Sequence, residues 1–266
     1  MKESAVSSDA LRFKFGDNWL DFLSVLNEDR IEAAVGSLKR IIGATNLSGR
    51  TFLDAGSGSG LFSLAARRLG ATVFSFDYDA QSTECTRQIK EKYFHGDPGW
   101  TIERGSVLDD EFLGKLGTFD VVYSWGVLHH TGNMHLAFKN ISELVSKNGI
   151  LIISIYNDQG FISKYWKFIK RAYNKNPLNR FFLILMHSPD LLLLRFIVRT
   201  ATGRLKEERG MTLWHDMTDW LGGYPFEVAK PEDVFAFFNE RGFRLSKLKT
   251  YGSRHGCNEY VFIKEK

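Results

Sequence analysis

The feature that most constrains this chain is a short apolar strand that runs into a loop with glycines at alternate positions. The strand is expected over 51–54, the glycines stand at 56, 58 and 60, and helix-like sequence follows over 60–69. A second expected strand, 72–77, ends in Asp77. Glycines let the backbone turn tightly and approach a ligand closely, and a helix start offers unpaired N–H groups. Because an acidic residue at the second strand end can accept hydrogen bonds from ribose hydroxyls, the segment predicts a site for a nucleoside-bearing cofactor.

Helices and short apolar strands alternate along the remainder of the chain. Further strands are expected over 101–107, 119–125 and 149–156, and helices over 79–93, 134–146 and, in two pieces, 19–43. Strands that are apolar throughout and separated by helices predict a doubly wound parallel α/β sheet covered on both faces. Near the C-terminus a helix over 231–241 precedes two segments, 243–250 and 259–263, which we expect to form an antiparallel hairpin on the sheet edge.

The glycine loop does not match a dinucleotide fingerprint, because Leu61 or Ser63 stands where a third small residue is needed. With Asp54 the loop reads D-x-G-x-G-x-G, which resembles the first motif of class I S-adenosylmethionine (SAM) methyltransferases. Residues 120–132 resemble the fourth motif of that family and its following loop, and 148–154 resemble its fifth strand. Within the family, the chain is most similar to the ubiquinone-biosynthesis-type O-methyltransferases. The resemblance implies a Rossmann-like sheet with strand order 3-2-1-4-5-7-6.

The resemblance also implies roles for individual residues around SAM. The methionine part of SAM is expected beside Asp54, Gly56, Ser57, Gly58 and Gly60, the ribose on Asp77, and the adenine against Tyr78. Ser106 and Val107 follow the third strand, where many relatives carry an acidic residue near the adenine amine, and Asp109 is an alternative for that role. Ser124 and Trp125 are expected beside the sulfonium. The segment 13–19, which includes Trp19, is similar to one that caps the cofactor in some relatives.

Composition sets the remaining bounds. The 266 residues allow one large domain with an insertion, and the two cysteines, Cys85 and Cys257, make no disulfide framework. The first ten residues lack an apolar signal segment, so we expect a cytoplasmic protein. The expected division is a helical cap over 1–45, a SAM-binding α/β domain over 46–156 and 228–266, and a basic helical insertion over 157–227 that covers the substrate.

Methyl transfer to a hydroxyl needs alignment of the nucleophile and removal of a proton. Histidine suits the second task because its pKa lies near neutrality. His129 and His130 follow the fourth strand, where a base could reach the substrate, and the sequence does not choose between them. His215 and His255 are further candidates. A metal site made of His215, Asp216 and His255 has no support in the spacing of these residues.

The insertion concentrates the basic charge of the chain. Residues 161–210 carry eleven Lys and Arg against three Asp and Glu, whereas the net charge of the whole chain is +4. Over 161–173 the apolar residues at 161, 162, 165, 166, 169 and 173 are expected on one helical face, with Lys164, Lys167, Lys170 and Arg171 on solvated faces. Apolar runs follow at 181–186 and 191–198, each too short to span a bilayer. Three interpretations stay open: a helical lid, a peripheral membrane contact through 160–205, and a nucleic-acid contact.

Two further segments carry residue types that bind ligands. The stretch 209–227 is rich in aromatic and polar residues and is interpreted as the wall of a substrate pocket, formed by Trp214, Asp216, Trp220 and Tyr224. The loop 254–258 adds Arg254. The sequence thus predicts a SAM-dependent methyltransferase acting on a small-molecule acceptor, at oxygen. The alternatives are an RNA methyltransferase and a SAM-binding protein without methyl transfer, and the oligomeric state stays open.

Overall fold

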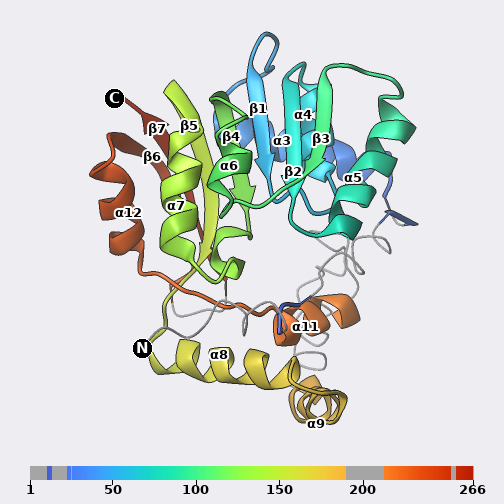
Figure 1. Cartoon of the computed structure of the whole chain (residues 1–266), viewed down its shortest axis with the longest axis vertical. Coiled ribbons are helices and arrows are strands. Elements are labelled where there is room, and N and C mark those ends of the chain that lie inside the picture. Colours follow the sequence, from blue (N-terminus) through green and yellow to red (C-terminus); the bar gives the residue numbers. More distant parts are fainter. Residues whose placement is uncertain (1–10, 14–22, 25, 190–212, 253–255, 266) are drawn as a thin grey trace.

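A seven-stranded sheet with the order β3-β2-β1-β4-β5-β7-β6 forms the centre of the computed structural model (Figure 1). The structure describes residues 11–13, 23–24, 26–189, 213–252 and 256–265. The parallel strands are β1 (Thr51–Ala55), β2 (Thr72–Asp77), β3 (Trp100–Arg104), β4 (Phe119–Trp125) and β5 (Val145–Tyr156). The doubly wound fold class and the strand order expected from the sequence are therefore confirmed.

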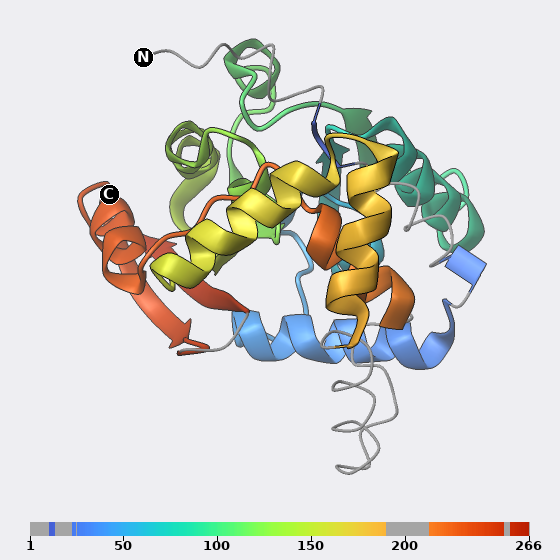
Figure 2. The ribbon, with the colours of Figure 1, turned by 90° about the horizontal axis from the view of Figure 1, so that it is seen from below.

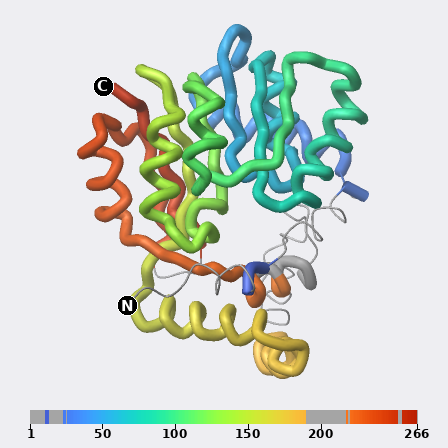
Figure 3. The backbone as a smooth tube through the Cα atoms, viewed as in Figure 1, coloured from blue at the N-terminus to red at the C-terminus, as the bar shows by residue number. Residues whose placement is uncertain are grey.

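Helices cover both faces of this sheet, as its apolar strands require. One face packs against α3 (Glu28–Ile42), α4 (Leu61–Arg68) and α5 (Ala80–Tyr93). The other face packs against α6 (Asp110–Leu113), α7 (Met134–Glu143) and α12 (Pro231–Asn239). The tube view follows the chain as it winds between these two layers (Figure 3).

Local capping explains where several helices begin. Asn27, Asp79 and Asn133 each accept a backbone N–H in the first turn of α3, α5 and α7 with their side chains, which satisfies donors that have no partner inside the helix. At the other end of α3, Gly43 takes the left-handed conformation (φ 77°) that commonly ends a helix.

The last two strands form the hairpin expected from the sequence. β7 (Cys257–Lys264) pairs with β5 in antiparallel fashion, and β6 (Phe243–Lys249) pairs with β7 and forms the edge. Several strand bounds differ from expectation by one or two residues, and β3 and β5 differ by more. β3 ends at Arg104 rather than at 107, because the Ser106 hydroxyl accepts the N–H of Leu108 and turns the chain toward α6. β5 begins at Val145, before the expected turn, and runs through Asn148, which has φ 63°.

A third layer lies beyond the carboxyl ends of the parallel strands (Figures 1 and 2). It contains α8 (Phe161–Tyr173), α9 (Pro177–Ser188) and α11 (Leu213–Gly222), which share a small hydrophobic cluster of their own. Part of the stretch 209–227 is thus the helix α11, which the sequence interpretation did not separate from the rest of the pocket wall. None of the helices that the structure describes has the length and apolar character needed to cross a membrane.

The buried face of α8 corrects the expectation from the sequence. Trp166, Ile169, Lys170 and Tyr173 are buried, whereas Phe161, Ile162 and Tyr165, expected on the same inward face, are exposed. Lys170, expected in solvent, is fully buried. The apolar residues of α8 form one broad face. The third layer covers only the part of that face around Trp166, Ile169 and Tyr173, and so leaves the remainder outside. The aliphatic stem of Lys170 packs there like an apolar side chain.

Candidate active site

The glycine turn between β1 and α4 has a backbone that other residues would not adopt readily. Gly56, Gly58 and Gly60 have φ values of 85°, 53° and 81°. A Cβ at Gly56 would lie 2.4 Å from a methyl group of Val127, and one at Gly60 would lie 2.9 Å from the Cα of Thr86. Two of these glycines are therefore needed because the loop after β4 and the helix α5 pack directly on the turn.

Asp77 holds the turn from the end of β2. One carboxylate oxygen accepts the N–H of Gly58 at 2.9 Å and the other accepts the N–H of Asp79 at 2.9 Å. Burial nevertheless raises the pKa of Asp77 to about 6, since desolvation disfavours the charged form. A carboxylate has about four acceptor positions, so these two bonds leave capacity for ribose hydroxyls.

Asp54 is buried near the end of β1, and its side chain reaches the first turn of α4. Its carboxylate accepts the hydroxyl of Ser63 at 2.5 Å, Ser63 shares a hydrogen bond of 2.7 Å with Ser75, and the indole N–H of Trp100 donates to Ser75 at 2.9 Å. Burial raises the pKa of Asp54 to about 7, and the negative charge of Asp77 adds to the rise.

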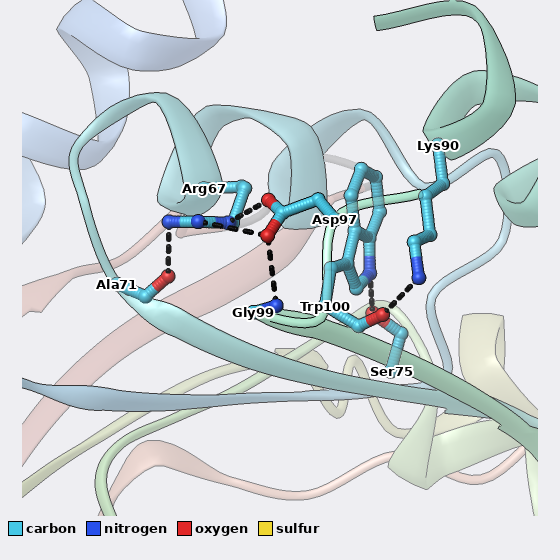
Figure 4. A network of polar contacts seen from close by, with 7 residues as sticks. All are labelled: Arg67, Ala71, Ser75, Lys90, Asp97, Gly99 and Trp100. Atoms are coloured by element: carbon cyan, nitrogen blue, oxygen red, sulfur yellow. Dashed lines mark hydrogen bonds and ion pairs between the residues drawn. The ribbon is translucent and has the colours of Figure 1, made fainter. Parts of the chain in front are cut away.

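The far end of this chain of bonds is fixed by a second polar network (Figure 4). Arg67 pairs with Asp97, Asp97 accepts the N–H of Gly99, and Lys90 donates to the carbonyl of Trp100. The network holds Trp100, and through Ser75 and Ser63 it fixes the orientation of Asp54.

The two carboxylates identify the kind of ligand that fits this turn. A dinucleotide fold places the pyrophosphate at the start of the helix after the first strand, and here that helix start receives Asp54. A pyrophosphate at that position would be repelled by the Asp54 carboxylate. A ligand with cationic groups and hydroxyl donors would be attracted, and SAM has its ammonium, its sulfonium and its ribose diol. The residues present therefore fit SAM.

Arg12 crosses from the N-terminal segment to two strand ends. Its guanidinium lies 4.8 Å from the centre of the Tyr78 ring and donates to the carbonyls of His130 and Thr131 at 3.0 Å each. The next residue, Phe13, donates its N–H to the carbonyl of Tyr224. Arg12 was not predicted from the sequence, because a lone arginine before an apolar segment carries no motif.

The other residues expected near SAM lie at the carboxyl ends of their strands or just beyond. Ser124 is buried and donates to the carbonyl of Ala55, and Trp125 stacks on Tyr123 with ring centres 5.8 Å apart. Val107 is buried after β3, beside Ser106. Asp109, the alternative acid for the adenine amine, caps α6 by accepting the N–H groups of Glu111 and Phe112.

The two histidines after β4 occupy different environments. His129 is fully buried, with its ring centre 4.1 Å from that of Tyr156. His130 is partly exposed, and its Nδ1 lies 2.6 Å from the carbonyl oxygen of Pro225. That contact requires Nδ1 to carry the proton, so the lone pair of the neutral ring belongs to Nε2. Burial lowers the pKa of His129 far below its usual range and that of His130 to about 3, and the positive charge of Lys170 lowers both further.

Glu227 fixes the histidine-bearing turn and was not predicted from the sequence. Its backbone N–H donates to the carbonyl of His129, and its carboxylate accepts the N–H groups of Gly132 and Met134. The carboxylate thus lies at the N-terminus of α7, where a negative charge is favourable. Its distance in the sequence from α7 explains why no local pattern could reveal it.

An aromatic cluster lies between the histidines and the third layer. Tyr156, at the end of β5, contacts Trp220 and Phe226 with ring centres 5.6 and 5.1 Å away. The ammonium of Lys170 lies 4.2 Å from the Trp220 ring and 4.9 Å from the Phe226 ring, and it donates to the carbonyl of Trp220. A pocket lined in part by Tyr156, Trp166, Trp220 and Phe226 has a volume of about 10 Å³, enough for about one water molecule.

Several expected site residues cannot be placed in this arrangement. Trp19, Arg254 and His255 lie outside the described residues. Trp214, His215 and Asp216 belong to α11, but their side chains also lie outside the described part. Tyr224 connects α11 to the segment that holds the histidines. Among the side chains that the structure describes, no group of three or more His, Cys, Asp or Glu could hold a metal ion.

Comparison with known proteins identifies the family. A family model described as a methyltransferase domain matches residues 26–216, more than half of the chain. The chain belongs to this methyltransferase domain family, and the recognition of a class I SAM-dependent methyltransferase is confirmed. SAM is accordingly the cofactor expected of the family.

Individual relatives match over less than half of the chain. The chain is 32% identical over 130 residues to a ribosomal protein L11 methyltransferase of Helicobacter hepaticus, covering 48% of this chain and 37% of that protein. It is 30% identical over 105 residues to a ubiquinone biosynthesis O-methyltransferase of Pelagibacter ubique, covering 40% of this chain and 41% of that protein. The chain therefore matches less than half of the length of these relatives.

Solved structures share the fold across the whole chain. A magnesium protoporphyrin IX methyltransferase from Synechocystis PCC 6803, solved with bound S-adenosylhomocysteine, has a TM-score of 0.57 and 15% identity, and the match covers 97% of this chain and 98% of that one. At this identity the likeness shows the fold alone.

Proposed function

We propose that the chain transfers the methyl group of SAM to an oxygen of a small-molecule acceptor. The observation that carries the proposal is the contact between Val127 and Gly56, which brings the turn bearing His129 and His130 against the glycine loop. A proton acceptor and a cofactor site thereby lie together at the carboxyl ends of the parallel strands. This end of the strands is the usual ligand site of open α/β sheets.

The proposed cofactor contacts follow the sequence expectation. Asp54 and the glycine turn would hold the methionine end of SAM, Asp77 the ribose, and Tyr78 the adenine. Ser106, Val107, Ser124 and Trp125 would complete the site, and Trp19 would cap it. We also keep as a proposal the division made from the sequence, into a helical cap, an α/β domain and an insertion over 157–227.

Of the two histidines, His130 is the better candidate for the base, and because its pKa is lowered to about 3, it requires an acidic acceptor hydroxyl such as that of a phenol. SAM supplies an electrophilic methyl group on a sulfonium. Nε2 of His130 would take the proton of the acceptor hydroxyl while the neighbouring aromatic rings orient the acceptor and exclude water. The cation of Lys170 lies close enough to lower the pKa of both histidines, and its charge would favour an ionised acceptor oxygen in the same way. His129 has no exposed surface and would need a larger rearrangement to act.

The names of these two relatives differ in what they act on: one names ribosomal protein L11, and the other names ubiquinone biosynthesis. Both matches cover less than half of this chain and of the relative, so they do not select the acceptor. We favour a small molecule because an aromatic, partly polar cluster lies at the strand ends, which is typical of small-molecule sites. The RNA and binding-only alternatives are outcomes of the same test.

The test is product formation with SAM and panels of phenols, hydroxyl-free amines, ribosomal proteins and RNA. We expect S-adenosylhomocysteine and a methyl ether with one class of hydroxyl acceptor. Methylation of RNA or protein alone would contradict the proposed acceptor. Tight SAM binding without product from any panel would support the binding-only alternative.

A further inference from the structure

The outer helix α9 turns its apolar stripe away from the protein. Leu178, Phe181, Phe182, Leu185 and Met186 recur at helical spacing and are all exposed, with Phe181 at 62% and Leu185 at 61%. The face of α9 that turns inward holds His187 and the partly buried Leu183 and Ile184. A stripe of this kind normally faces a core, so its outward position needs an explanation.

The neighbouring helix α8 adds a second exposed apolar surface. Phe161, Ile162, Tyr165 and Phe168 are exposed, with Phe161 at 82% and Phe168 at 69%. Seen from below, α8 and α9 lie side by side on the outside of the third layer (Figure 2). We name these nine exposed side chains of the two neighbouring helices the α8–α9 face. Large exposed apolar patches mark interaction sites in soluble proteins.

The charge around the α8–α9 face has one sign. Lys164, Lys167, Arg171 and Arg180 are exposed on the same two helices and Lys175 is exposed in the turn between them. The sequence from 161 to 189 contains no Asp or Glu. Apolar and aromatic side chains mixed with cations are the features of helices that lie in the plane of an anionic membrane surface. A nucleic-acid surface would need the cations but not nine exposed apolar side chains.

We propose that the α8–α9 face docks on the surface of an anionic lipid bilayer. The apolar side chains would enter the boundary between headgroups and acyl chains, and the cations would contact lipid phosphates. Because α8 and α9 lie beyond the carboxyl ends of the parallel strands (Figure 1), docking would turn the cofactor-binding edge of the sheet toward the membrane. The proposal is independent of methyl transfer, since lipid binding needs neither SAM nor an acceptor.

The experiment is co-sedimentation of the full chain with vesicles of phosphatidylcholine alone, or of equal parts phosphatidylcholine and phosphatidylglycerol. We expect the protein to pellet with the anionic vesicles, less with the neutral ones, and less at high salt. The double variant Phe181→Ser/Leu185→Ser should lower vesicle affinity at least tenfold, because it removes two large apolar side chains from the interface. The variant Lys164→Gln/Lys167→Gln should lower affinity for anionic vesicles by about tenfold or more.

Matched controls separate this effect from general changes. Phe235→Ser removes an exposed aromatic ring from α12, and Lys115→Gln removes an exposed cation near α6. Both should pellet like the unaltered chain. All these side chains are exposed, so circular dichroism should show each variant folded.

Four results would overturn the proposal. The unaltered chain could stay in solution with anionic vesicles, or the Phe181→Ser/Leu185→Ser variant could pellet equally well. RNA could displace the chain from vesicles and bind the Phe181→Ser/Leu185→Ser variant with full affinity, which would assign the cations to nucleic acid. Sedimentation velocity could show that the unaltered chain is a dimer, that the Phe181→Ser/Leu185→Ser variant is a monomer, and that neither binds vesicles. This result would assign the α8–α9 face to a second copy of the chain.

Discussion

Asp54 and Asp77 set the charge of the cofactor site at the scale of single residues. Burial raises their pKa values to about 7 and about 6, so both are partly protonated in the ligand-free protein near neutrality. SAM brings positive charge, which favours the ionised carboxylates. We therefore predict that SAM affinity rises between pH 6 and pH 8 and that binding near pH 6.5 releases protons. Calorimetry in buffers of different ionisation enthalpy measures both.

The variant Asp54→Asn isolates the contribution of one carboxylate. It should weaken SAM binding by about tenfold or more and flatten the pH dependence. Asp120→Asn is the matched control, because Asp120 lies at the amino end of β4, away from the cofactor turn, and its carboxylate accepts the N–H of Thr51. Equal effects of the two variants would contradict the proposed role of Asp54.

Asp54 also makes a prediction about stability. A carboxyl group whose pKa is raised in the folded state stabilises the fold below its unfolded pKa, 3.8, and this stabilisation is lost as the pH rises through about 7. The ligand-free variant Asp54→Asn should therefore have a higher Tm than the unaltered chain at pH 8 and a smaller advantage at pH 5. Thermal unfolding at the two pH values tests this. A lower Tm of Asp54→Asn at pH 8 would contradict the prediction. It would show that hydrogen bonds to the Asp54 carboxylate offset the cost of burying its charge.

His130 carries the proposed proton transfer. The variant His130→Gln should lower kcat by about a hundredfold or more and leave SAM affinity nearly unchanged. Since the pKa of His130 is lowered to about 3, its protonation should not reduce kcat between pH 8 and pH 5. His135→Gln, an exposed histidine on α7, is the control. A full-rate His130→Gln enzyme would exclude this residue as the base.

At the scale of elements, the third layer is the part most separable from the sheet. Trp166 is buried in its small cluster beside Trp220. Replacement by Ala should cost about 3–5 kcal/mol of local stability. We predict that Trp166→Ala removes hydrogen-exchange protection from α8 while β1 and β4 keep theirs. Phe168→Ala, an exposed position on the same helix, should change neither. Loss of protection throughout the sheet would show that the two parts unfold together.

The elements also show what the sequence could and could not predict. The glycine turn, the parallel strands and the hairpin of β6 and β7 follow from local patterns, and these were predicted with bounds shifted by a few residues. The inner face of α8 was predicted only in part, because contact with α11 decides how much of its broad apolar face is covered. The positions of Lys170, Arg12 and Glu227 depend on partners far away in the sequence. The candidate site was therefore predictable where one strand and its loop build it, and not where distant segments meet.

At the scale of the whole molecule, the candidate site gathers at one end of the parallel strands. The cofactor turn, the histidine-bearing loop and the aromatic cluster all lie at the carboxyl ends of these strands, and the third layer covers them (Figure 1). The α8–α9 face forms the outside of that layer. The molecule thus has a cofactor-binding body and an outer surface suited to contact with a partner, joined through Tyr156 and Trp220.

The central claim is that the glycine turn flanked by Asp54 and Asp77 binds SAM. The most direct test is calorimetric titration of the purified chain with SAM, S-adenosylhomocysteine and NAD. We predict binding of the first two, weakened by Asp77→Ala, and no binding of NAD. Binding of NAD alone, or SAM affinity unchanged in Asp77→Ala, would contradict the account.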